Sequence, residues 1–138
     1  MKDQIFYIDT AIWIDCYEDR KSGDLDIGKI AIIFFNFLLA SKSKIVISNV
    51  LMEELSNFYS LEQIRGMMSL YEHLFIKVNL TKRQMNEAQI LKLQRKVPLG
   101  DVIHAVLTRD NNAILIARDK HFKILKDICN TEKPEDLT

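Results

Sequence analysis

The sequence predicts an α/β fold in which a doubly wound parallel sheet of about four to five strands is flanked by helices. Short apolar segments rich in β-forming residues recur along the chain, and longer amphipathic segments separate them. This alternation is typical of parallel sheets, whose strands need helical crossover connections. The 138 residues contain no internal repeat, low-complexity tract or linker. We therefore expect one domain over residues 1–138.

Four segments are predicted to be buried strands because they are short, apolar on both faces and rich in β-branched or aromatic residues. They are residues 5–8, 44–48, 75–80 and 113–117. Helices are expected at about 10–19, 25–41, 49–60, 61–74, 82–96 and 101–110, and a turn followed by a helix is expected within 118–128. Ser48 or Asn49 is expected to cap the third helix, and Thr81 the fifth. Pro98 and Gly100 interrupt the chain before residue 101.

The bulk composition is that of an ordinary soluble globule, with 48% hydrophobic and 28% charged residues. Lys plus Arg equals Asp plus Glu at 19 each. This balance argues against broad nucleic-acid binding, although it leaves room for a local basic groove. The longest apolar stretch, residues 30–40, is about half the length that spans a bilayer. The first residues, MKDQ, lack a signal-peptide pattern, so we expect a cytoplasmic protein that does not contact membranes.

The two cysteines, Cys16 and Cys129, stand alone in the sequence. Their spacing indicates neither a disulfide framework nor a zinc site.

Two acidic residues are expected at the carboxyl edge of the sheet, where the ligand sites of open parallel sheets lie. Asp9 directly follows the first predicted strand, and Asp119 follows the fourth after one intervening residue. A carboxylate taken out of water costs several kcal/mol, in order of magnitude, unless a cation or hydrogen bonds compensate it. Asp9, between two apolar runs, therefore either caps a turn or faces a cation.

Two further acidic candidates lie on predicted helices. Glu54 is preferred to Glu53 because its helical face also carries Val50, Leu51 and Phe58, whereas Glu53 faces outward. A carboxylate on the apolar side of a helix is costly unless it has a compensating partner, whereas a carboxylate on the polar side remains in water. Asp101 is expected to start the helix after Gly100, where backbone N–H groups favour an anion.

Each of these acids also has an ordinary structural explanation. Asp101 and Asp119 could be helix caps, Asp9 could form an Asx turn with Thr10, and Glu54 could pair with a lysine. A functional site is indicated by the four acids taken together rather than by any one of them. Two carboxylates 4 Å apart repel by roughly 4 kcal/mol at an effective dielectric near 20. Mg²⁺ or Mn²⁺, which prefer carboxylate oxygen, would remove that repulsion.

Four motifs in chain order carry a resemblance to a known family: IDTAIWID, VISNVLMEELSNF, LGDVIHAVL and ARDKHF. Together they resemble the PIN-domain ribonucleases, most closely the small prokaryotic and archaeal toxins of the VapC type. The resemblance covers nearly the whole chain, including the tail EKPEDLT. It implies a PIN-like fold and hydrolysis of RNA with Mg²⁺ or Mn²⁺. It also implies that the catalytic and metal-binding residues are Asp9, Glu54, Asp101 and Asp119.

Other polar residues are expected to support this site. Thr10 occupies the hydroxyl position that follows the first Asp in the family, where it could contact a phosphate or a ligand carboxylate, or simply cap a helix. His104 is expected to pack behind the site rather than to act as a general base, and Arg118 could contact a phosphate. His121 is interpreted as a surface residue. Three basic residues on one predicted helix could line an RNA groove, although a solvated helix face is the better explanation for each of them alone: Lys92, Arg95 and Lys96.

The resemblance also implies partners, namely an RNA substrate, a small antitoxin protein and a second copy in a homodimer. Two alternatives remain open: an RNA-processing PIN nuclease without an antitoxin, and a non-catalytic PIN module that binds RNA or protein. A haloacid-dehalogenase-type phosphatase is disfavoured because it needs a second Asp where Ala11 stands.

Overall fold

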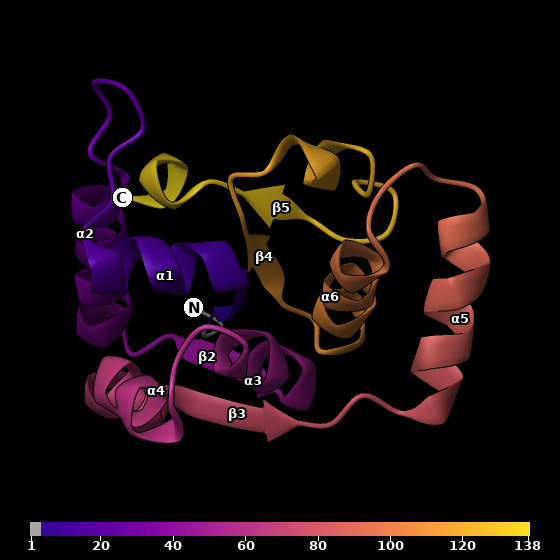
Figure 1. Cartoon of the computed structure of the whole chain (residues 1–138), viewed down its shortest axis with the longest axis horizontal. Coiled ribbons are helices and arrows are strands. Elements are labelled where there is room, and N and C mark those ends of the chain that lie inside the picture. Colours follow the sequence, from indigo (N-terminus) through magenta and orange to yellow (C-terminus); the bar gives the residue numbers. More distant parts are fainter. Residues whose placement is uncertain (1–3) are drawn as a thin grey trace.

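Five parallel strands form one sheet in the order β3–β2–β1–β4–β5 (Figure 1). The computed structural model describes residues 4–138, so the first three residues, on which part of the signal-peptide interpretation rests, lie outside the description. The strands are β1 (Ile5–Ile8), β2 (Lys44–Ser48), β3 (Phe75–Val78), β4 (Ile114–Ile116) and β5 (Thr131–Glu132). The strand order changes direction beside β1, so a switch point lies between β1 and β4.

Helices cover both faces of the sheet, which confirms the doubly wound prediction (Figure 1). The α-helices are α1 (Thr10–Glu18), α2 (Ile27–Ser41), α3 (Asn49–Ser56), α4 (Leu61–Met68), α5 (Lys82–Leu93) and α6 (Leu99–Asp110). Three 3₁₀ helices follow strands or helices: η1 (Ser69–Leu74), η2 (Lys120–Lys123) and η3 (Pro134–Leu137). None of the helices within residues 4–138 is long and apolar enough to cross a membrane.

Alternation along the strands divides the core into two clusters. Phe6 and Ile8 of β1 pack with α1, α2, α3 and α4 on one face. Tyr7 points to the opposite face and packs with α6 and with the segment after β4. Because successive strand residues point to opposite faces, a polar group at position 7 lies in a different layer from its neighbours.

Two predicted caps are present. The Ser48 hydroxyl accepts a hydrogen bond from the Leu51 N–H at the start of α3. Thr81 and Gln84 form a capping box at the start of α5. In both cases the side chain satisfies N–H groups that the helix itself leaves unpaired, so α3 begins directly where β2 ends.

The segment after β4 differs from its prediction. Instead of an α-helix it forms η2 and a series of turns, and β5 follows where only a polar tail was expected. Its buried apolar residues recur at every third position, Phe122, Leu125 and Ile128, and i→i+3 backbone hydrogen bonds join them. A spacing of three suits 3₁₀ turns rather than an α-helix.

Several helix boundaries also differ from their predictions, and α3 and α5 end at Ser56 and Leu93, before the expected positions 60 and 96. The predicted helix over residues 61–74 divides into α4 and η1. Helix α6 begins at Leu99, so Asp101 lies inside its first turn rather than at its start, and the Asp101 N–H donates to the Pro98 carbonyl. Position 101 still lies where helical N–H groups favour a negative charge.

Candidate active site

Asp9 lies directly after β1, at the N-terminus of α1, and its residue is only 8% exposed. Burial raises the pKa of this carboxyl from 3.8 to about 6; the charge of His104 opposes the rise, and the charges of Asp101 and Glu54 add to it. Within residues 4–138, no lysine or arginine forms an ion pair with Asp9. The carboxylate is therefore buried among like charges without a permanent cation beside it.

Glu54 reaches the same region from α3. Its Oε1 accepts a hydrogen bond from Thr10 Oγ1 at 2.5 Å and contacts His104 Nε2 at 2.8 Å. Burial alone would raise the pKa of Glu54, but the hydrogen bonds from His104 and Thr10 and the charge of His104 lower it. Glu53 is exposed, as predicted. Phe58, used in the helical-face argument, is 70% exposed and lies beyond the end of α3.

Asp101 and Asp119 are joined by His121. The His121 Nδ1 lies 3.2 Å from Asp101 Oδ2 and 3.2 Å from Asp119 Oδ1. Asp119 also caps η2 by accepting the His121 N–H at 2.8 Å. Burial raises the pKa of Asp101, the charge of Asp119 raises it further, and His121 opposes both. His121, interpreted as a surface residue, is partly exposed, with 34% of its side chain accessible, and the tight turn into η2 also brings its ring to the two acids.

Beneath Glu54 lies a group of fully buried polar side chains, Tyr7, Ser48 and His104, each at most 1% exposed. The Tyr7 hydroxyl lies 2.5 Å from His104 Nδ1 and 2.7 Å from Ser48 Oγ. Burial raises the pKa of the Tyr7 phenol, so Tyr7 is neutral. Tyr7 was not among the residues predicted for the site, and Ser48 was predicted only as a helix cap. The available signal was a hydroxyl in the middle of a buried strand and another at a strand end.

Arg118 is turned towards the C-terminal segment. Its Nη1 and Nη2 donate to the two carboxylate oxygens of Glu135 at 2.7 and 2.9 Å. The guanidinium thus joins the end of β4 to η3. The three basic residues predicted on one helix do not share it, because α5 ends at Leu93 and only Lys92 lies on it, whereas Arg95 and Lys96 lie in the segment that follows it. Arg95 forms an ion pair with Asp127.

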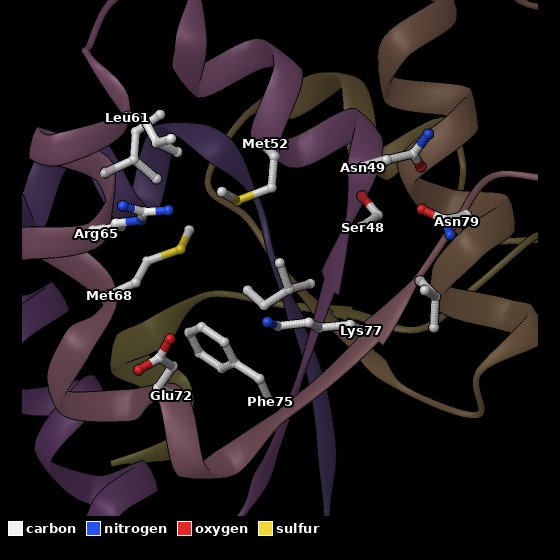
Figure 2. Close-up of a pocket in the computed structure, with 13 residues that line it drawn as sticks. Ser48, Asn49, Met52, Leu61, Arg65, Met68, Glu72, Phe75, Lys77 and Asn79 are labelled. Carbon is white, nitrogen blue, oxygen red and sulfur yellow. The ribbon is translucent and has the colours of Figure 1, made fainter.

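Two cavities lie near this edge of the sheet. One of about 140 Å³ adjoins Asp119 and is also lined by the lysines Lys123, Lys126 and Lys133. A larger one of about 330 Å³ lies between α3, α4 and β3, and Figure 2 shows Met52, Met68 and Phe75 at its walls. The larger cavity contains none of the four candidate acids.

The four acids are the natural candidates for a metal centre. Within residues 4–138, no group of three or more His, Cys, Asp or Glu side chains is arranged so that it could hold a metal ion. Glu54 faces Thr10 and His104 instead, while Asp101 and Asp119 face His121. The donor chemistry nevertheless fits a hard divalent cation, since carboxylate oxygens are its preferred ligands and Asp9 has no lysine or arginine partner in the described chain.

Solved structures share this fold at low sequence identity. VapBC2 from Rickettsia felis, bound to a DNA fragment from its promoter, matches at 16% identity with a TM-score of 0.69, covering 94% of this chain and 98% of the other. A toxin–antitoxin complex from Klebsiella pneumoniae matches at 22% identity with a TM-score of 0.64, covering 96% of this chain and 98% of the other. VapC20 from Mycobacterium tuberculosis, a sarcin–ricin-loop-cleaving toxin, matches at 15% identity with a TM-score of 0.62, covering 87% of this chain and 94% of the other.

The sequence itself is matched by one family. A comparison with curated proteins gave no match. The sequence pattern of the PIN domain, in contrast, matches residues 6–128, which include all four candidate acids. The chain therefore belongs to the PIN domain family.

Proposed function

We propose that this protein is a metal-dependent endoribonuclease that hydrolyses RNA phosphodiester bonds. The observation that supports this most strongly is the buried carboxylate of Asp9, which lies among the charges of Glu54 and Asp101 without a lysine or arginine partner in the described chain. A fold that keeps such a group at the switch point of its sheet must compensate it, and a divalent cation does so with the right ligand chemistry.

Asp9, Glu54, Asp101 and Asp119 are the residues that would hold Mg²⁺ or Mn²⁺. Such an ion, when bound, lowers the pKa of a water molecule and offsets charge on the phosphoryl oxygens. The protein holds the four carboxylates in position. The backbone after β1 fixes Asp9, the hydroxyl of Thr10 and the ring of His104 fix Glu54, and the turn into η2 sets Asp119 near Asp101.

The RNA backbone needs cationic contacts, since phosphates supply most of the affinity in nucleic-acid binding. The cavity beside Asp119 offers them through Lys123, Lys126 and Lys133, none of which forms an ion pair within residues 4–138. Asp119, Glu132 and Asp136 line the same cavity, so we propose that RNA phosphates contact the three lysines individually rather than a uniformly basic groove. Arg118, held by Glu135, borders the same cavity.

We further propose that the protein acts in the cytoplasm as the toxin of a toxin–antitoxin pair and that it forms a homodimer. The fold is shared with toxins solved in complex with antitoxins. Exposed apolar residues, including Ile90 and Leu93 on α5, are consistent with a protein partner or a second copy. Growth arrest on expression, abolished by Asp9→Asn, would support the toxin; RNA cleavage without arrest would favour an RNA-processing nuclease.

The test of the nuclease is RNA cleavage by the purified protein. Wild-type protein should cleave structured or single-stranded RNA with Mg²⁺ or Mn²⁺ and stop when EDTA is added. Asp101→Asn should abolish cleavage while the thermal unfolding transition stays cooperative. Cleavage that survives EDTA, or that Asp101→Asn leaves intact, would show that these acids do not form the active site.

A further inference from the structure

We infer that Tyr7 is a positioning residue for Glu54, acting through His104, and that Ser48, Tyr7 and His104 form a hydrogen-bonded relay that aims the Glu54 carboxylate at the metal. The inference rests on the proposed function, because Glu54 is taken to be a metal ligand. It adds residues that lie below the site, on β1 and at the end of β2, and that do not themselves touch metal or substrate.

The relay connects four separate elements. Ser48 Oγ accepts the Leu51 N–H at 3.0 Å and lies 2.7 Å from the Tyr7 hydroxyl. The same hydroxyl lies 2.5 Å from His104 Nδ1, and His104 Nε2 lies 2.8 Å from Glu54 Oε1. Tyr7 and His104 are 97 residues apart in sequence, so only the tertiary fold brings them together.

The donor groups of the relay can all point the same way, from α3 towards the Glu54 carboxylate. Because the Leu51 N–H must donate, Ser48 is free to donate its own proton to Tyr7, and Tyr7 to donate to His104 Nδ1. With His104 neutral, that assigns the ring proton to Nε2, which donates to the Glu54 carboxylate. When the nearby carboxylates keep His104 protonated, Nδ1 donates to the Tyr7 hydroxyl instead, and Nε2 still donates to Glu54. A ring nitrogen held in this way fixes both the tautomer and the orientation of the imidazole.

The burial of the relay argues that it does more than fill space. Tyr7 and His104 are both at most 1% exposed, and a buried hydroxyl or ring nitrogen without a partner costs free energy. Phenylalanine at position 7 would fill nearly the same volume without burying a hydroxyl group. The chain of buried polar groups runs from the cap of α3 at Ser48 to the Glu54 carboxylate, so it ties the position of Glu54 to the core.

The two oxygens of Glu54 are held differently. Oε1 receives both His104 and Thr10, whereas Oε2 has no hydrogen bond within the described chain and lies beside Gly100. The relay thus fixes one oxygen and leaves the other available as a ligand. In characterised metal sites, removing such an outer partner costs about 10–100-fold in metal affinity.

The experiment measures Mn²⁺ affinity directly, by following free Mn²⁺ with electron paramagnetic resonance into the millimolar range. The variants are Tyr7→Phe, His104→Leu and His104→Gln, with the exposed His73→Gln as a matched control. Tyr7→Phe and His104→Leu should bind Mn²⁺ about tenfold more weakly than wild type. His104→Gln, whose amide can donate in place of Nε2, should recover much of the loss, and His73→Gln should behave as wild type.

A double-mutant cycle separates positioning from mere stability. If Tyr7 acts through Glu54, Tyr7→Phe should weaken Mn²⁺ binding in the wild-type background and have no further effect in Glu54→Gln. Unchanged affinity in Tyr7→Phe, or an equal loss in both backgrounds, would overturn the inference. Wild-type RNA cleavage is assayed on the same samples. Metal-dependent cleavage with unchanged affinity in Tyr7→Phe would overturn the relay alone, whereas absence of cleavage would overturn the proposed function.

Discussion

The backbone of Gly100 lies against the carboxylate of Glu54: a side-chain carbon at position 100 would stand 3.1 Å from Glu54 Oε2. Gly100 is the second residue of α6, where glycine is disfavoured because it loses more backbone freedom than alanine on folding. The hydrogen bonds at Oε1 restrict how far Glu54 can move away. The glycine thus leaves room for a carboxylate that the protein holds in place.

Gly100→Ala should therefore separate stability from activity. We expect a melting temperature equal to or above that of wild type, because alanine favours the helix, together with about tenfold weaker Mn²⁺ binding because the added methyl group displaces Glu54. Gly66→Ala is the matched control, since it lies within α4 with open space around it. It should stabilise the protein without changing RNA cleavage. Cleavage by Gly100→Ala at the wild-type rate would contradict this account.

Asp9 should make the stability of the metal-free protein depend on pH. Its pKa is higher in the folded chain than in the unfolded chain, so the folded state binds more protons between these values and loses stability as the pH rises from about 4 to about 6. A rise from 3.8 to about 6 corresponds to roughly 3 kcal/mol, at about 1.36 kcal/mol per pH unit. Asp9→Asn should lack this loss.

Urea unfolding of wild type and Asp9→Asn in EDTA, at a series of pH values from 4 to 7.5, measures the effect. The difference between the two proteins isolates Asp9 from the other titrating groups. We expect Asp9→Asn to be the more stable protein at pH 7.5 and the advantage to shrink towards pH 4. A variant that is less stable than wild type at pH 7.5 would show that Asp9 is compensated within the protein.

The sequence predicted the framework of the site better than its internal contacts. The bounds of β1 and β2 were predicted correctly because both are apolar on both faces, and the placement of Asp9 followed from that pattern. β5 was missed because Thr131–Glu132 is too short and polar to show strand periodicity. It exists because β4 offers it a free edge.

The contacts of the histidines depended on tertiary structure. His104 reaches Tyr7 and Glu54 across separations of 97 and 50 residues, which no local pattern encodes. The contact of His121 with the two acids was missed because the segment around it was expected to be an α-helix after a turn. In a 3₁₀ turn capped by Asp119, the ring points back to the acids instead.

The ion pair between Arg118 and Glu135 should be structural rather than catalytic. Glu135→Ala would leave the partly buried guanidinium of Arg118 without its bidentate partner, and we expect the free energy of unfolding to fall by about 1–2 kcal/mol. RNA cleavage by the folded fraction should persist. Chemical denaturation and an RNA cleavage assay at low temperature test both parts. Loss of cleavage without loss of stability would place Arg118 or Glu135 in the active site.

The most direct test of the central claim is the position of Mn²⁺ in a crystal of the wild-type protein, located by its anomalous scattering. We expect a peak within roughly 2.0–2.6 Å of an Asp9 carboxylate oxygen, the range for divalent cations on oxygen ligands. Glu54, Asp101 or Asp119 should complete its coordination directly or through water. A peak elsewhere on the molecule, with none at Asp9, would contradict the account.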